Sequence, residues 1–312
     1  MVGGRTVRVA AIDCGTNSIR LLIADIHDRS FKEVIRRMEV VRLGQGVDKN
    51  KTFDPEAIER TLKVTADYAR VIASKGVERI RFCATSATRD ASNRALFIDG
   101  VREILGIEVE VIPGAEEAAL SFMGGTKELS VSDGPFLVVD IGGGSTEFVL
   151  GTSKVDSAKS VNIGCVRMAE RHLNQQPPAI ESVAAATADI DAAIATAAHD
   201  VAITTAKTLI CVAGTATTVA AAALGLTEYD RYAIHLARIP AQKVHEVAAM
   251  FQSMDREEIA ALGYMHPGRV DVITAGSLVL SRVLHATGAT EFVASESDIL
   301  DGIAWGLAES GS

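Results

Sequence analysis

The segment FLVVDIGGGSTEFVL, residues 136–150, decides the fold of this chain. An apolar run ends in Asp140, three consecutive glycines and a Ser-Thr-Glu sequence follow, and a second apolar run begins at Phe148. Consecutive glycines cost backbone entropy when they become ordered, so their use here indicates a close approach of the backbone to a ligand. Asp140 ends a predicted strand, and loops at such strand ends carry ligands in open α/β sheets. A glycine-rich bend without a ligand is the alternative.

A weaker copy of this segment opens the chain. An apolar run over residues 7–13 leads into Asp13-Cys-Gly-Thr-Asn-Ser18, and a second run follows over residues 19–26. The turn is too short for a crossover helix, so its two strands should be antiparallel neighbours. Two related units of this kind would place two similar turns facing each other across a cleft.

The first turn carries groups that suit anions and cations. Its small residues expose successive N–H groups, which can form an anion-binding nest, and Thr16, Asn17 and Ser18 add side-chain donors. Asp13 can hold a hard cation, because such cations prefer oxygen ligands. A hairpin turn with hydrogen-bonding residues is the alternative interpretation.

Three other stretches could carry chemistry. Val212-Ala-Gly-Thr-Ala-Thr-Thr218 joins a predicted strand to a helix start, where phosphate binds readily, although a plain helix cap reads the same way. The adjacent Glu116 and Glu117 either complement a helix dipole or include a general base that activates a water. Arg89 precedes a predicted helix and could clamp phosphate, or it is a lone surface arginine.

Strands and helices alternate along the chain, so the predicted class is α/β. Its 312 residues suggest two domains, and the pattern restarts after Asp133-Gly-Pro135. We therefore expect domains over residues 1–128 and 129–312, with a closing helix near 298–312 that could pack back on the first.

The composition limits which binding partners and which cellular compartment we expect for this protein. The net charge of -9 argues against a nucleic-acid binder, and any polyanion site must be locally positive within an acidic protein. No apolar run is long enough for a membrane span, and no signal peptide precedes the first strand. Four widely spaced cysteines predict neither disulfides nor a metal cluster, so we expect a cytoplasmic protein.

The motifs DCGTNS, RFCATSATRDASN, IPGAEEA, VVDIGGGSTE, IGCVRM and AGTATTVAA together resemble the exopolyphosphatase/guanosine pentaphosphatase (Ppx/GppA) family over nearly the whole chain. The resemblance implies two actin-like, ribonuclease H-like domains of the ASKHA superfamily, with the active site in the cleft between them. The chain resembles the short, two-domain form of the family. One segment, Ser295–Gly302, departs from the family pattern, because Leu300 stands where an arginine is common.

The resemblance also implies roles for individual residues. Glu117 matches the proposed catalytic base, and Glu147 matches a second acidic residue that helps catalysis or metal binding. Asp13 and Asp140 are the expected metal ligands, for Mg²⁺ or alternatively Mn²⁺. Residues expected at the substrate phosphates are Gly15, Thr16, Asn17, Ser18, Arg89, Gly142, Gly143, Gly144, Ser145, Thr146, Gly214, Thr215 and Thr217.

These roles predict an exopolyphosphatase that releases orthophosphate from the end of inorganic polyphosphate. A guanosine pentaphosphate (pppGpp) phosphohydrolase needs the same chemistry plus a guanosine contact, and the sequence does not separate the two. A superfamily ATPase or sugar kinase, and a non-enzymatic polyphosphate or nucleotide sensor, are more remote alternatives. We expect no nucleic-acid or membrane partner, and a homodimer.

Overall fold

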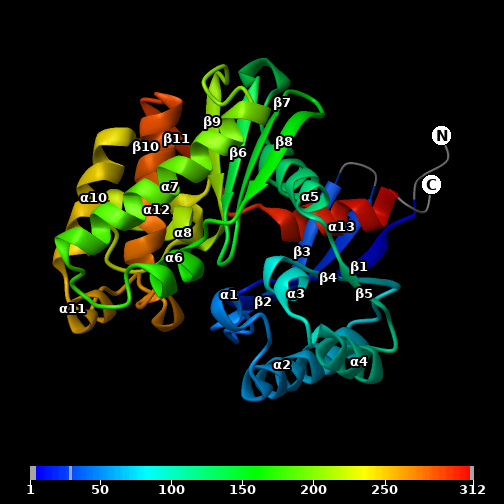
Figure 1. The fold of residues 1–312 in the computed structure, drawn as a ribbon. Helices are drawn as coiled ribbons and strands as arrows, with labels where there is room; N and C mark the ends of the chain where they lie inside the picture. Colours follow the sequence, from blue (N-terminus) through cyan, green and yellow to red (C-terminus); the bar gives the residue numbers. More distant parts are fainter. Residues whose placement is uncertain (1–4, 28–29, 310–312) are drawn as a thin grey trace. The chain divides into compact units, whose positions relative to one another are not determined.

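The structure is a computed structural model that describes residues 5–27 and 30–309. The chain divides into two compact units, and Figure 1 shows their elements in sequence colours. One unit ends at Leu120 and takes up the chain again from Ile299, and the other spans Ser121–Asp298. Each unit is built around its own mixed sheet.

The sheet of the first unit has the strand order β3-β2-β1-β4-β5. Strands β1, β2 and β3 are antiparallel neighbours, whereas β4 and β5 run parallel to β1. The elements of this unit are β1 Val7–Cys14, β2 Ser18–His27, β3 Ser30–Val40, α1 Val47–Asn50, α2 Pro55–Ser74, β4 Arg79–Ala84, α3 Ser86–Asp90, α4 Arg94–Leu105, β5 Val109–Val111, the start of α5 Gly114–Thr126, and α13 Ile299–Glu309.

Helix α2 begins at Pro55 because the residues there suit a helix start. The side chain of Asp54 accepts a hydrogen bond from Glu56 N, and Pro55 takes the first helical position, where its missing N–H costs nothing. The buried positions recur at helical spacing and include Ile58, Tyr68 and Ile72. This stripe packs α2 against the first sheet.

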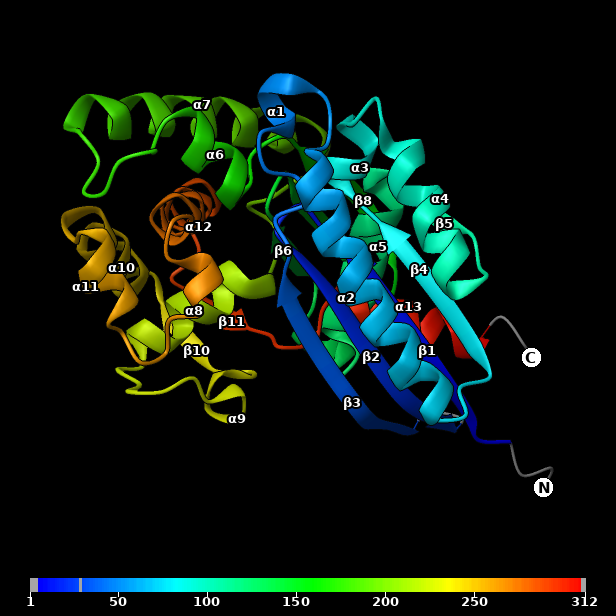
Figure 2. The ribbon, with the colours of Figure 1, turned by 90° about the horizontal axis from the view of Figure 1, so that it is seen from below.

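Strand β1 is buried on both of its faces. Ala10 and Ile12 belong to the core shared with α2 and α4, while the alternating Val9 and Ala11 are equally inaccessible to solvent. Helix α13 contacts β1, β2 and β4, and Figures 1 and 2 show it on the opposite side of the sheet from α2. The first sheet is therefore a central layer between helices.

The sheet of the second unit has the order β10-β11-β9-β6-β7-β8. Strands β6, β7 and β8 are antiparallel neighbours, and β9 and β11 run parallel to β6. The elements are η1 Val131–Asp133, β6 Phe136–Ile141, β7 Thr146–Gly151, β8 Val155–Val161, α6 Cys165–Arg171, α7 Ile180–Asp200, β9 Thr208–Val212, α8 Ala213–Ala223, α9 Arg231–Ile234, β10 Arg238–Pro240, α10 Ala241–Ser253, α11 Arg256–Ala260, η2 Pro267–Arg269, α12 Ile273–Thr287 and β11 Glu291–Ala294.

The two sheets repeat one topology. The order β3-β2-β1-β4-β5 corresponds to β8-β7-β6-β9-β11, with the same strand directions at each step. The α/β class predicted from the sequence is confirmed, and so is the antiparallel pairing around the first turn. The cleft expected between two actin-like domains stays a prediction.

The division between the units falls inside helix α5. Its last turns belong to the second unit, where a Cβ on Gly125 would lie 3.1 Å from Val212 and 3.6 Å from Val138. The sequence placed the boundary at residues 128–129, after the helix, because a helix is the natural unit of a sequence pattern. Helix α13 belongs with the first unit, to which the Arg36–Asp301 ion pair also ties it.

An alanine-rich stretch forms the single long helix α7, Ile180–Asp200. Within the part of the chain that the structure describes, no helix is both long and apolar enough to span a bilayer. The sequence missed several short elements, among them α3 and α6, because so few residues carry too little periodicity.

Candidate active site

The two turns predicted from the repeat close with the same backbone hydrogen bond. Gly15 N donates to Ser18 O at 2.9 Å, and Gly142 N donates to Ser145 O at 3.0 Å. Each turn joins the first two strands of its own sheet. The repeat seen in the sequence therefore extends to the backbone geometry of the turns.

A buried aspartate precedes each turn. Asp13 accepts hydrogen bonds from Arg20 Nε at 3.0 Å and Arg20 Nη2 at 2.6 Å, both through Oδ2. Arg20 faces Asp13 because the β1–β2 register pairs the two residues. Asp140 Oδ2 accepts a hydrogen bond from Ser121 Oγ at 2.5 Å. Both carboxylates are therefore held in place by neighbours within their own unit.

These two aspartates were the predicted metal ligands. Among residues 5–27 and 30–309, no group of three or more His, Cys, Asp or Glu side chains suits a metal ion. Mg²⁺ often binds through only one or two carboxylates, with waters and substrate phosphates completing its octahedron. Within its own unit, each of the buried carboxylates of Asp13 and Asp140 fits such a partial set of ligands, and neither fits an all-protein cage.

The start of helix α6 donates hydrogen bonds to the backbone carbonyls of the glycine loop. The backbone amides of residues 165–167 donate to the carbonyls of Gly142 and Gly143, and Arg167 Nε donates to Gly144 O at 2.6 Å. A Cβ on Gly164 would lie 2.4 Å from Gly143 O, so only glycine permits this approach. Because the N–H and C=O of a peptide point in opposite directions, the loop amides beyond these carbonyls face away from α6.

Thr146 and Glu147 lie in strand β7 and are fully buried. Thr146 Oγ1 donates to Ile163 O at 2.5 Å, and Ser160 Oγ donates to Glu147 Oε1 at 2.7 Å. In the described residues, both side chains therefore link β7 to the strand and turn that follow it. Their predicted roles at phosphate and in catalysis stay predictions.

The third stretch that was predicted to face phosphate forms the start of helix α8, which begins at Ala213. Ala213 begins the helix with a φ of 67°, in the left-handed region that favours glycine. Thr215 and Thr217 follow, both nearly buried. The guanidinium of Arg269 lies directly on Gly214, where an added Cβ would meet Nη2 at 2.4 Å.

The predicted base Glu117 is paired with Arg89. Arg89 Nη1 donates to Glu117 Oε2 at 2.6 Å and to Ile112 O at 2.9 Å. Burial raises the pKa of Glu117, the charge and hydrogen bond of Arg89 oppose that rise, and the nearby Asp13 carboxylate adds to it. A buried carboxylate of this kind is a good proton acceptor once it is ionised.

Glu117 and its neighbour Glu116 differ in how far their side chains are buried. The side chain of Glu117 is 11% exposed, whereas that of Glu116 is 41% exposed and pairs with Arg81 at 2.5 Å. The sequence alone offered both carboxylates at this helix start. Their different burial favours Glu117 as the base.

Two buried hydroxyls in the first unit lack hydrogen-bond partners within the described part of the chain. They are Thr16 Oγ1, in the first turn, and Thr88 Oγ1, in helix α3 beside Arg89. A buried hydroxyl is normally satisfied, so an unsatisfied one points to a bound ligand or water. Thr16 was predicted from the sequence, and Thr88 was not.

Arginines supply the positive charge that an acidic chain needs at an anion site. Arg20 adjoins the first turn, Arg167 the second and Arg269 the third, while Arg89 holds Glu117. The sequence singled out only Arg89. A hairpin register would have indicated Arg20 opposite Asp13, but no local pattern places Arg269 against Gly214.

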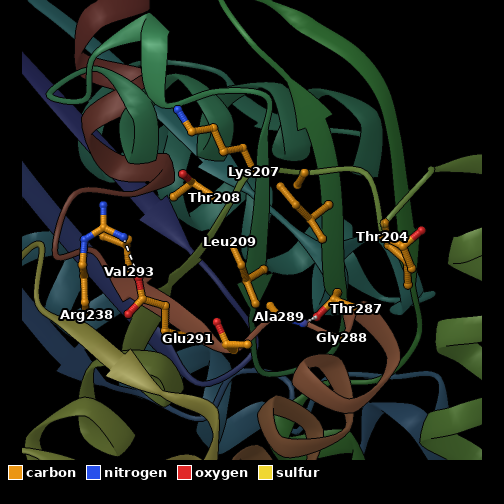
Figure 3. A pocket seen from close by; sticks show the side chains of 14 residues that line it. Thr204, Lys207, Thr208, Leu209, Arg238, Thr287, Gly288, Ala289, Glu291 and Val293 are labelled. Atoms are coloured by element: carbon orange, nitrogen blue, oxygen red, sulfur yellow. Dashed lines mark hydrogen bonds and ion pairs between the residues drawn. The ribbon is translucent and has the colours of Figure 1, made fainter.

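A pocket of about 290 Å³ lies elsewhere in the second unit (Figure 3). Leu137 and Leu209 line it near the start of β6 and β9, whereas Asp140 lies at the end of β6. Arg238 and Glu291, which also line it, form an ion pair at 2.6 Å. The pocket is therefore at the other end of the sheet from the turns and contains none of the predicted site residues.

Comparisons with known proteins show the family of this chain. Residues 22–309 match the Ppx/GppA phosphatase family. Exopolyphosphatase 2 of Mycobacterium tuberculosis is 46% identical, over 96% of this chain and 98% of its own length. A crystal structure of an exopolyphosphatase-like protein covers 98% of both chains, with 45% identity and a TM-score of 0.94. A guanosine-5'-triphosphate,3'-diphosphate pyrophosphatase of Vibrio atlanticus is 35% identical over 54% of this chain and 34% of its own.

Proposed function

The chain belongs to the Ppx/GppA phosphatase family, and on that premise we propose that it is an exopolyphosphatase that removes terminal phosphates from inorganic polyphosphate. The proposal rests mainly on the sequence similarity to exopolyphosphatase 2 over nearly the full length of both chains. The likeness to guanosine pyrophosphatases covers little more than half of this chain. The pppGpp reaction is therefore the second candidate.

In the first unit, Glu117 acts as the general base. Its ionised carboxylate accepts a proton from the water that attacks the terminal phosphorus in line with the leaving phosphate. Arg89 keeps this carboxylate ionised in a buried environment. Thr16 and Thr88 offer buried hydroxyls that have no hydrogen-bond partner among the described residues and could bind a ligand or water.

In the second unit, the glycine loop and the start of α8 bind phosphate groups. Helix α6 fixes the carbonyls of Gly142 and Gly143, and the loop amides other than that of Gly142, which donates to Ser145 O, would donate to anionic oxygens. The N-terminus of α8 adds its free amides and its dipole. Phosphoryl transfer depends mainly on such positioning and charge neutralisation.

Mg²⁺, with Mn²⁺ as a substitute, would bind at Asp13 and Asp140 and neutralise charge on the phosphoryl oxygens. Glu147 would act indirectly, because its hydrogen bond with Ser160 places it within the β7–β8 pair. A homodimer and a cytoplasmic location remain predictions from the sequence.

The decisive experiment measures phosphate release with Mg²⁺ from short polyphosphate, long polyphosphate, pppGpp and ATP at equal concentration. Faster release from polyphosphate supports the proposal. Faster release from pppGpp would instead support the second candidate, the pppGpp reaction, at the same site residues. Tight binding of all four without release would indicate a sensor and refute both.

A matched pair of variants tests the base. Glu117→Gln should lower kcat by ~10²–10⁴, the usual contribution of a general base. Glu116→Gln changes the adjacent, more exposed carboxylate and should leave kcat near the wild-type value. Equal losses in the two variants would remove Glu117 from the mechanism.

A further inference from the structure

A chain of hydroxyls leads from the start of α8 to a carboxylate. The Tyr229 hydroxyl lies 2.8 Å from Thr217 Oγ1 and 2.5 Å from Glu296 Oε1. Glu296 follows strand β11, and its backbone N donates to His235 Nδ1 at 3.2 Å, which fixes the segment. All four residues belong to the second unit.

The number of protons on this chain limits what Thr217 can do. The phenol of Tyr229 has one proton and two neighbours within hydrogen-bond distance. An ionised Glu296 can only accept hydrogen bonds. The phenol O–H therefore donates to this charged acceptor at 2.5 Å in preference to a neutral hydroxyl. Thr217 must then supply the proton for its own contact with Tyr229, and it has none left for an anion.

We propose that Tyr229 and Glu296 are positioning residues that set the direction of the Thr217 hydroxyl and thereby weaken or strengthen its grip on substrate phosphate. When Glu296 is protonated, its O–H can donate a hydrogen bond to Tyr229. The Tyr229 O–H can then donate to Thr217, and the Thr217 O–H can donate to a phosphate oxygen. The inference rests on the proposed function, because it takes Thr217 as a phosphate ligand.

The geometry makes this chain more than a chance contact. Thr217 is 4% exposed, whereas Tyr229 is 40% exposed, so the chain leads from a buried hydroxyl toward the surface of the second unit. Tyr229 comes from the loop after α8 and Glu296 from the segment after β11, so the Tyr229 hydroxyl joins helix α8 to a separate segment of the chain. The Glu296 segment belongs to the stretch that departs from the family pattern.

Glu296 has a mixed charge environment. Burial is the main cause that raises its pKa, and the charged or titratable groups that face it are Tyr229, Arg231, Asp298, Arg269 and, through the backbone, His235. A raised pKa means that Glu296 takes up its proton at a higher pH than an exposed glutamate does. Phosphate affinity should therefore increase as the pH falls through that pKa.

The test is a double-mutant cycle with Glu296→Gln and Tyr229→Phe. Tripolyphosphate binding is measured by calorimetry in a Glu117→Gln background, in which turnover is slowed. Each single change frees the Thr217 proton, so each should lower Kd by about three- to tenfold, the range of one neutral hydrogen bond. The double variant should bind no more tightly than either single variant.

Other outcomes overturn the inference. Additive gains would mean that Glu296 acts only as a repelling charge, and weaker binding by Tyr229→Phe would mean that Tyr229 is merely structural. A pH dependence of Kd that is as large in Glu296→Gln as in the parent protein would also refute it, because tripolyphosphate titrates equally in both. If the otherwise unchanged protein neither binds tripolyphosphate nor releases phosphate, the proposed function itself fails, which is a distinguishable result.

Discussion

Replacing Arg89 by glutamine would isolate the ion pair that controls the proposed base. Arg89 Nη1 lies 2.6 Å from Glu117 Oε2, and its side chain is 24% exposed while that of Glu117 is 11% exposed. Glutamine keeps an N–H donor on a shorter side chain and removes the charge, and lysine keeps the charge for comparison. The change therefore tests the electrostatic part of the contact.

The magnitude follows from the position of the pair. Two unit charges about 4 Å apart attract by about 4 kcal/mol at an effective dielectric constant of about 20. Partial exposure of Arg89 reduces this toward the roughly 1.5–3 kcal/mol of a hydrogen bond to a charged group. On the acid side of the pH profile, that energy corresponds to a roughly ten- to 150-fold lower ionised fraction of Glu117.

The sign follows from the role of Glu117. A base must be ionised, so activity rises as the pH rises through its pKa. Burial already raises that pKa and Arg89 opposes the rise, so losing Arg89 moves the acid limb to higher pH. The loss of kcat/KM should be largest at low pH and should shrink as the pH increases.

The assay is the pH profile of kcat/KM for polyphosphate with Arg89→Gln, Arg89→Lys and Arg81→Gln. Lysine restores the charge and should restore much of the acid limb. Arg81→Gln removes the partner of the neighbouring Glu116 and should leave the limb in place. A loss that is equal at every pH would refute the argument and would instead make Arg89 a simple phosphate clamp.

Three further predictions concern the scaffold. Gly164→Ala should displace the glycine loop and abolish phosphate release while the protein stays folded by circular dichroism, whereas Gly306→Ala, with the nearest atom 4.0 Å from the added Cβ, should be benign. Asp301→Asn should weaken the ion pair with Arg36 and lower the free energy of unfolding by roughly 1.5–3 kcal/mol in urea titration. Phe97→Ala should cost about 3–5 kcal/mol by the same method, because its ring is fully buried; a smaller loss would mean that the site collapses around the cavity.

Long, strongly patterned elements could be predicted from the sequence. Helix α2 has a capping aspartate, a first-position proline and a regular apolar stripe, and the structure places it over Pro55–Ser74. The turns of the repeat were also predictable, because Gly, Ser and Thr between two apolar runs leave few alternatives. Short helices such as α3 and α6 were missed, although α6 is the element that holds the glycine loop.

The charges around the site could not be predicted from local pattern. Arg167 and Arg269 reach their turns from segments 23 and 55 residues along the chain from Gly144 and Gly214, and neither lies in a recognisable charge run. Which member of the Glu116–Glu117 pair is buried was equally open. Adjacent residues of a helix point in different directions, and only the packing around α5 decides which side of the helix is buried.

The sequence by itself determined the α/β class, the repeat of two strand–turn–strand units and the family, because these depend on the order of residue types along the chain. Tertiary structure alone decided that Glu117 is the enclosed carboxylate, that arginines from distant segments lie against the turns and that the Tyr229 hydroxyl contacts both Thr217 and Glu296. The physical reason is that burial and charge pairing depend on neighbours in space, and those neighbours are set by packing across many residues of chain.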